Sequence, residues 1–169
     1  MSILLNTDPL LPDIIDEQIR LLIIGLALSP KSAETGHYYA DSDEQFYALL
    51  FQSGLVPEKL TPEQDEVLLK HNIGLTNLIK NKPITSAQDI NPIDHSIGVI
   101  IRTIFDYKPE IVCFNGELAY THFYDRRGEY GLQKVKIGDA KIFVVPDSNI
   151  RRCEMKFEEK LGYYKQLER

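Results

Sequence analysis

Leu21-Leu22-Ile23-Ile24-Gly25-Leu26-Ala27-Leu28 is a continuous apolar run with no polar side chain. Such a run indicates a strand buried on both faces, as in a parallel sheet whose sides are covered by helices. Residues 111–114 and 142–145 are runs of the same kind, and residues 74–78 form a shorter candidate strand. Helical patterns separate these runs. We therefore predict an α/β fold, a three-layer α/β/α sandwich with a short, mostly parallel central sheet.

Start and stop signals locate the helices between these strands. Ser42 and Gln45 have the spacing of a capping box, and Gly54 is a plausible stop for the helix that follows. Thr61 and Gln64 have the same capping-box spacing, and a proline stands at the first helical position after Thr61. Asn91-Pro92 opens another helix, with a predicted apolar face of Ile93, Ile97, Ile100, Ile101 and Ile104. The last helix follows Cys153 and presents Phe157, Leu161 and Tyr164 on one face.

Length and composition indicate one ordinary globular domain over residues 1–169. The net charge of −6 argues against a protein that coats DNA non-specifically, although a local basic patch can act within an acidic molecule. Two cysteines cannot form a disulfide framework or a four-cysteine metal site, and Cys113 is expected to be a buried free thiol. Residues 1–15 lack the cationic start of a signal peptide, and no run is long enough to span a membrane. We expect a cytoplasmic protein.

The fold class predicts where ligands bind, namely outside the carboxyl ends of the parallel strands. The connection after the first strand, residues 29–41, is unusually long and polar, and such connections are often functional. It carries His37 and the adjacent Tyr38 and Tyr39. An aromatic arm at this edge of the sheet offers a stacking surface for a planar ligand.

Several motifs in order resemble the mismatch-specific uracil/thymine-DNA glycosylases. Residues 25–29, Gly-Leu-Ala-Leu-Ser, stand where that family has Gly-Ile-Asn-Pro-Gly, and Gly36-His37-Tyr38-Tyr39 stands where it has its Gly-x-x-aromatic arm. Glu44-Gln45-Phe46-Tyr47 falls on its Asn-x-Phe-Trp helix start, and Gly74-Leu75-Thr76 on its Gly-aliphatic-Thr strand. Residues 108–120 and 145–152 are similar to its third strand with the following helix and to its DNA-wedge loop. The similarity spans roughly residues 18 to 167.

The resemblance implies a glycosylase that extrudes a mismatched or damaged base from double-stranded DNA and hydrolyses its N-glycosidic bond. It places Tyr39 at the stacking position, with Ser32 and Thr76 also contacting the base. Ile150 stands where the family has the wedge that fills the gap in the duplex. The remaining DNA contacts implied are Lys31, Ser148, Asn149, Arg151 and Arg152. It implies no cofactor and no metal, and we expect a monomer that associates with the nucleoid when bound to DNA.

One departure from the family concerns catalysis. The water-positioning asparagine of the family is replaced by Ala27, whose methyl group can neither orient nor deprotonate water. A carboxylate elsewhere is the expected substitute, as in relatives that share this alanine. Asp89, after the Thr76 strand, is the first candidate, and Asp94 and Glu44 are alternatives.

Each of these residues also has a purely structural interpretation. Ser32 can bond within its own turn, Tyr39 can pack the arm onto the sheet, and Asp89 can be a solvated loop carboxylate. A second possibility, which Ala27 and the acidic net charge favour, is a degenerate glycosylase fold that holds DNA or a free nucleobase without cleavage. A third possibility is an unrelated α/β enzyme acting on a small phosphorylated metabolite, but no glycine-rich phosphate motif follows any strand.

Overall fold

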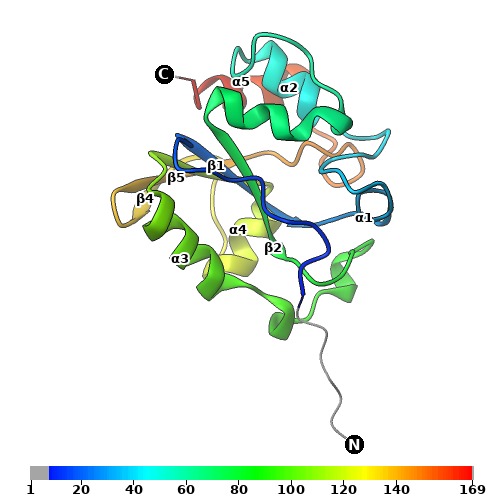
Figure 1. Cartoon of the computed structure of the whole chain (residues 1–169), viewed down its shortest axis with the longest axis vertical. Helices are drawn as coiled ribbons and strands as arrows, with labels where there is room; N and C mark the ends of the chain where they lie inside the picture. Colours follow the sequence, from blue (N-terminus) through cyan, green and yellow to red (C-terminus); the bar gives the residue numbers. More distant parts are fainter. Residues whose placement is uncertain (1–7, 169) are drawn as a thin grey trace, which may run out of the picture.

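A five-stranded, mostly parallel sheet forms the centre of the molecule in the computed structural model, which describes residues 8–168 (Figure 1). The strand order is β2-β1-β3-β5-β4. The parallel strands are β1 (Leu21–Ala27), β2 (Ile73–Ile79), β3 (Ile111–Asn115) and β5 (Ala140–Val145). The predicted α/β fold and its four strands are confirmed. Residues 1–7, part of the stretch examined for a signal peptide, lie outside the described residues.

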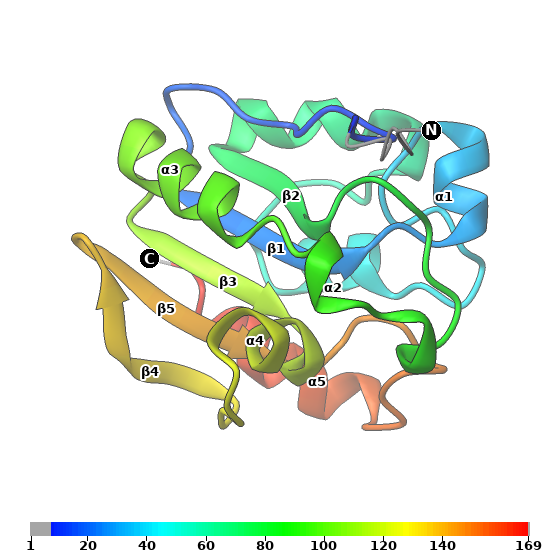
Figure 2. The same cartoon turned by 90° about the horizontal axis from the view of Figure 1, so that it is seen from below.

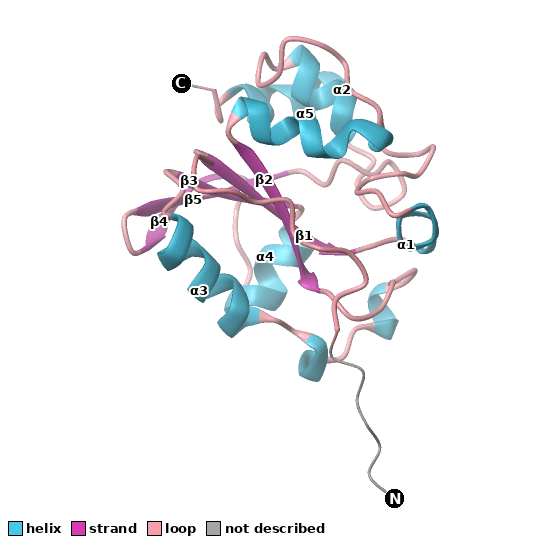
Figure 3. Cartoon of the chain, viewed as in Figure 1, coloured by secondary structure: helices cyan, strands magenta, loops and turns pink. Residues whose placement is uncertain are grey.

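Helices cover both faces of the sheet, which gives the expected three layers (Figure 3). One face carries α2 (Phe46–Gln52), the 3-10 helix η1 (Pro62–His71) and α5 (Phe157–Lys165). The other carries α3 (Ile97–Tyr107) and α4 (Glu117–Tyr124). Shorter helical turns are α1 (Pro30–Thr35), η2 (Ala87–Asp89) and η3 (Pro92–Asp94). Within residues 8–168, no helix has the length and apolar character needed to cross a membrane.

One strand, at the edge of the sheet, was not predicted from the sequence. β4 (Gly131–Ile137) runs antiparallel to β5 at the outer edge of the sheet (Figure 2). Its side chains alternate between half-buried and exposed, with Lys134 and Lys136 on the exposed side. An edge strand with one solvated face lacks the continuous apolar run by which three of the other strands were predicted.

The helix boundaries differ from the prediction at several points. The expected capping box of Ser42 and Gln45 does not open α2, because the Gln45 amide donates instead to the Ser148 carbonyl and the helix starts at Phe46. The Asn91-Pro92 signal opens only one turn, η3, before α3 begins separately. The connection after β1 contains a short helix, α1, with Pro30 at its first position.

Other helix signals hold. Gln64 accepts a hydrogen bond from the Thr61 amide at 3.0 Å, and Gly54 follows α2 with a φ of +84°. Cys113 is a buried free thiol, as expected. On the predicted face of α3, Ile100 and Ile104 are buried, whereas Ile93 is 73% exposed because it lies on the separate turn.

The alternation of the central strands decides which polar residues share a face. Ile23, Leu75 and Cys113 pack with α2 and α5, whereas the next residue in each strand packs on the opposite side. Two residues further along each strand, Gly25, Asn77 and Asn115 therefore face the α2 and α5 side at the carboxyl edge of the sheet.

Candidate functional site

A pocket lies at the carboxyl edge of β1, β2 and β3, where ligands bind in sheets of this kind. Its polar walls come from the strand ends, from the arm after β1 and from the loop after β5: Ser29, Ser32, Tyr39, Asp41, Glu44, Asn77, Asn115, Asp147, Asn149 and Arg152. In the free protein the cavity measures about 50 Å³. That is smaller than the roughly 150 Å³ that admits a benzene ring, so a wall must move before a whole base can enter.

The floor of the pocket depends on a glycine. Gly25 of β1 pairs in register with Asn77 of β2, and a Cβ atom at position 25 would lie 2.4 Å from Asn77 Oδ1. The same atom would lie 3.0 Å from the Tyr39 hydroxyl. The absence of a side chain at position 25 therefore leaves room for both groups.

Asn77 supplies a free amide to this floor. The residue is only 5% exposed and lines the pocket, yet no group within residues 8–168 forms a hydrogen bond with its side chain. Buried amides normally have partners. An unpaired donor and acceptor at the bottom of a pocket suit the edge of a heterocyclic base, which carries both kinds of group.

Tyr39 stands beside this floor in an unusual conformation. Its ring stacks on Phe46 with the centroids 3.8 Å apart, and its backbone φ is +55°, in the left-handed region. Within residues 8–168 the buried hydroxyl forms no hydrogen bond of good geometry. Burial raises the pKa of Tyr39 well above its usual value, and the nearby Asn115 opposes part of that rise. Tyr39 lines the pocket rather than being sealed in the core.

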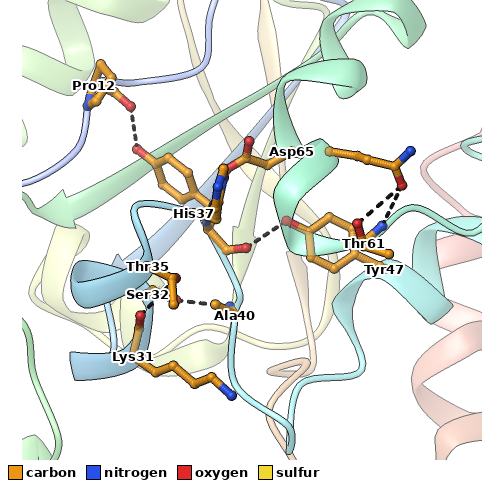
Figure 4. A network of polar contacts seen from close by, with 11 residues as sticks. Pro12, Lys31, Ser32, Thr35, His37, Ala40, Tyr47, Thr61 and Asp65 are labelled. Carbon is orange, nitrogen blue, oxygen red and sulfur yellow. Dashed lines mark hydrogen bonds and ion pairs between the residues drawn. The ribbon is translucent and has the colours of Figure 1, made fainter.

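Side chains fix the backbone on both sides of Tyr39, and Figure 4 labels Ser32, Ala40, Tyr47 and Asp65, which take part in these contacts. The Tyr38 amide donates to Asp65 of η1 at 3.0 Å, and the Tyr38 carbonyl accepts from the Tyr47 hydroxyl at 2.7 Å. On the other side, the Ala40 amide donates to Ser32 Oγ at 3.0 Å. Strained backbone persists where the surroundings over-determine it. These three hydrogen bonds therefore set the position of the Tyr39 ring.

Glu44 brings a carboxyl group to the pocket wall. Its Oε1 accepts a hydrogen bond from the Ser148 hydroxyl, and a β-bridge joins Glu44 to Asn149. Burial is the main cause that raises the pKa of Glu44 to about 8, with the neighbouring Asp147 adding to the rise. Burial also raises the pKa of Asp147. Carboxyl groups with raised pKa values in a pocket are candidates for proton transfer near neutral pH.

Asn115 holds the loop after β5 against the strand ends. Its Oδ1 accepts from the Ser148 amide at 3.0 Å and from the Tyr164 hydroxyl at 3.2 Å, and its Nδ2 donates to Ser148 Oγ at 2.9 Å. Because Ser148 Oγ already accepts from Asn115, its single proton is directed to Glu44. A chain of hydrogen bonds thus runs from α5 through Asn115 and Ser148 to Glu44.

Some of the residues expected to act on the base lie at this pocket and others do not. Ser32 and Tyr39 line it. Thr76 points to the opposite face of the sheet, where its hydroxyl donates to Asp13 at 2.8 Å. Asp89 is exposed on η2, accepts from the Thr85 hydroxyl at 3.2 Å and does not line the pocket. Of the three carboxylates considered from the sequence, only Glu44 lies at the pocket wall; Asp94 pairs with Lys82 elsewhere.

The expected DNA contacts are also divided. Ile150 is 48% exposed, and Arg151, Arg152 and Lys31 are exposed, so all four are available to an outside partner. Arg151 pairs with Asp43 at 2.6 Å, and Arg152 lines the pocket. Ser148 is fully buried and Asn149 forms pocket wall, so these two hold the loop together in this state.

Sequence reasoning missed Asn77, Asp41 and Asp147. Asn77 was missed because Thr76 beside it was chosen instead. The alternation of side chains along a strand shows that two neighbours point to opposite faces, but it does not show which of them faces the pocket. One signal for the missed residues was available in the sequence, because Asn115 and Asp147 stand at or just after the ends of predicted strands. Among the described residues, no group of three acidic, histidine or cysteine side chains is arranged to hold a metal.

Comparisons with known proteins agree with the fold of the chain. The solution NMR structure of a Methanosarcina acetivorans protein proposed to be a uracil DNA glycosylase is similar, with a TM-score of 0.67 and 21% identity. The match covers 94% of this chain and 97% of that protein, which supports the fold. The sequence profile of the Uracil DNA glycosylase superfamily matches residues 12–167. The chain therefore belongs to the uracil DNA glycosylase superfamily.

Proposed function

We propose that this protein is a monofunctional DNA glycosylase of the mismatch-specific uracil/thymine type, which excises uracil or a related mismatched or deaminated base. The observation that carries the proposal is the pocket itself, where an aromatic ring, a free buried amide and a carboxyl group meet. Membership of the superfamily supports the reaction class. Recognition in the pocket and the reaction both require a base that has left the duplex stack, because none of these groups can reach a stacked base.

Binding begins at the exposed loop after β5. Ile150 enters the gap that the extruded nucleotide leaves, and Arg151, Arg152 and Lys31 contact the flanking phosphates. The base then moves toward Tyr39, and the pocket widens to admit it. Stacking on an aromatic ring contributes about 1–3 kcal/mol per base. Asn77 reads the edge of the base through its unpaired amide.

Glu44 takes the part that the asparagine plays in the family. Ala27 and Glu44 both line the pocket, so a carboxyl group is present where the usual amide is missing. In its ionised form, Glu44 accepts a proton from the water that attacks the sugar carbon C1′. The negative charge also stabilises the cationic sugar that forms as the C–N bond breaks. Removing such a group typically lowers a rate by about 10²–10⁴-fold.

Duplex DNA with a single uracil, treated with alkali after incubation, reports base release as strand breaks. We expect breaks with the natural protein and a loss of about 10²-fold or more in Glu44→Gln. Asp89→Asn tests the carboxylate favoured from sequence alone, and a large loss confined to that variant would reassign the catalytic carboxylate to Asp89.

The second candidate is a binding module without turnover. Ala27 and the net charge of −6 favour it. No release from uracil, hypoxanthine, mismatched or chemically damaged duplexes, together with salt-sensitive DNA binding that falls in Ile150→Ala, would favour the module over the enzyme.

A further inference from the structure

The carboxyl group of Glu44 lies partly buried at the pocket wall, and no ion pair within residues 8–168 joins it to a lysine or arginine. The neighbouring carboxylates of Asp147 and Asp41 both raise its pKa. Asp147 differs, because Arg152 and Lys160 both act on it electrostatically. Buried charges are normally paired. A carboxyl group left unpaired at a pocket wall is suited to a positive charge that arrives with a ligand.

Other groups of the pocket favour the same kind of ligand, while Arg152, a cation that also lines it, acts on Asp147. Asp41 adds a second carboxylate, and the ring of Tyr39 offers a surface that attracts cations. Asn77, more than nine-tenths buried and without a partner, indicates independently that a polar heterocycle belongs on this floor. Together these groups suit a flat, polar and positively charged ring.

We infer that the preferred substrate class is a positively charged, N-alkylated base in DNA, held between Tyr39, Asn77 and the carboxyl group of Glu44. This inference rests on the proposed glycosylase function and specifies its substrate. A ring-alkylated purine such as 7-methylguanine or 3-methyladenine carries its positive charge on the ring. Uracil and hypoxanthine are neutral.

The chemistry also explains how Ala27 is tolerated. When the bond between C1′ and the ring nitrogen breaks, its electron pair moves to the base and cancels the positive charge, so the base leaves as a neutral molecule. Water then forms a bond to C1′ and gives its proton to the Glu44 carboxylate, from which it passes to solvent. A leaving group that departs neutral needs less assistance than one that departs as an anion.

The positive charge also ionises the group that activates water. In the empty pocket, burial keeps Glu44 mostly protonated at neutral pH, since its pKa is raised to about 8. A cation beside it favours the carboxylate, while Asp147 and Asp41 oppose ionisation and Ser148 supports it. The substrate therefore promotes formation of the catalytic base, and base release should reach half its maximum at a lower pH for a cationic base than for uracil.

Release of bases from duplex DNA methylated with dimethyl sulfate tests the inference, with uracil and hypoxanthine duplexes in parallel. Chromatography identifies the released bases, and DNA without protein gives the spontaneous rate. We expect release of methylated purines at least tenfold above the spontaneous rate and faster than release of the neutral bases. Glu44→Gln should reduce the ratio of methylated to neutral release at least tenfold. Glu58→Gln, an exposed glutamate outside the pocket, should leave the ratio unchanged.

The possible results separate this inference from the proposed function. Release of uracil or hypoxanthine with methylated purines left at the spontaneous rate overturns the inference and keeps the glycosylase. No release from any duplex overturns both. Release of methylated purines with an unchanged ratio in Glu44→Gln removes Glu44 from recognition and overturns the inference, provided that circular dichroism shows the variant folded.

Discussion

Gly25 and Asn77 face each other across β1 and β2 so closely that a Cβ atom at position 25 would lie 2.4 Å from Asn77 Oδ1. Real Cβ atoms do not approach oxygen atoms at that distance. The free amide on which base recognition depends is therefore positioned by a residue that contributes no side chain.

Gly25→Ala tests this dependence. The added methyl group must displace the Asn77 amide or the Tyr39 hydroxyl, and overpacking of this kind typically costs about 1–3 kcal/mol. We expect a lower melting temperature and a larger loss of base release than the stability change explains. The control is Gly98→Ala, because position 98 has open space around it and alanine favours helices by about 0.5–1 kcal/mol. Normal base release in Gly25→Ala would show that the floor tolerates a side chain.

Two substitutions of Tyr39 separate its ring from its hydroxyl group. Tyr39→Ala should weaken binding to DNA with an extrudable uracil by about 1–3 kcal/mol, roughly 5–150-fold, while binding to undamaged DNA changes less. Tyr39→Phe keeps the ring and removes a buried hydroxyl that forms no hydrogen bond of good geometry within residues 8–168, so stability should be unchanged or slightly higher. Fluorescence anisotropy with matched duplexes gives the affinities. Equal losses for both duplexes in Tyr39→Ala would exclude a stacking role.

The sequence predicted the fold well because the fold depends on local patterns. Continuous apolar runs identified three strands, residues 74–78 gave a shorter fourth, and the end of the first strand identified the arm that carries Tyr39. β4 was missed because a one-sided edge strand shows only weak alternation. The prediction succeeded where a few neighbouring residues carry the pattern, and it failed where the pattern is weak within a single strand.

The catalytic part of the site was harder to predict, because its contacts join distant segments. Glu44 was an alternative to Asp89 in the sequence, but it is distinguished only by its contact with Ser148, 104 residues later in the chain, and by its place in the pocket wall, which no local pattern encodes. Asp89 was favoured because it follows a strand, yet the chain carries it to an exposed turn. Thr76 and Asn77 are equally polar neighbours, and only the register of β2 with β1 shows which one faces the pocket.

Asn115→Ala tests the chain of hydrogen bonds that fixes the loop after β5. The substitution leaves the buried Ser148 amide without its acceptor and removes one hydrogen bond each from the Ser148 hydroxyl and the Tyr164 hydroxyl, which keep Glu44 and the Pro146 carbonyl as partners. The unsatisfied amide costs about 1–3 kcal/mol and each other lost hydrogen bond about 1 kcal/mol, so we expect a total loss of about 3 kcal/mol in urea unfolding. Asn91→Ala is the control, because this exposed residue caps a single turn and should cost about 1 kcal/mol or less. Similar losses in both variants would contradict the role of Asn115.

The titration of Glu44 makes stability depend on pH in a defined direction. The folded protein keeps the Glu44 proton until about pH 8, whereas the unfolded chain releases it near its ordinary pKa of 4.5. Between these values the unfolded state binds fewer protons, so this group's contribution to stability is fully present below pH 4.5 and is lost as pH rises through 8. The glutamine in Glu44→Gln cannot titrate, so this variant does not show the loss of stability that ionisation of Glu44 causes as pH rises. In melting experiments from pH 4.5 to 9, the stability of the natural protein should fall relative to the variant and the difference should level off above pH 8.

Glu58→Gln, which alters an exposed carboxylate, should give a curve parallel to that of the natural protein. Parallel curves for Glu44→Gln as well would mean that Glu44 is ionised in the folded protein at neutral pH, and the carboxyl group would then need a cation that is already present in the fold.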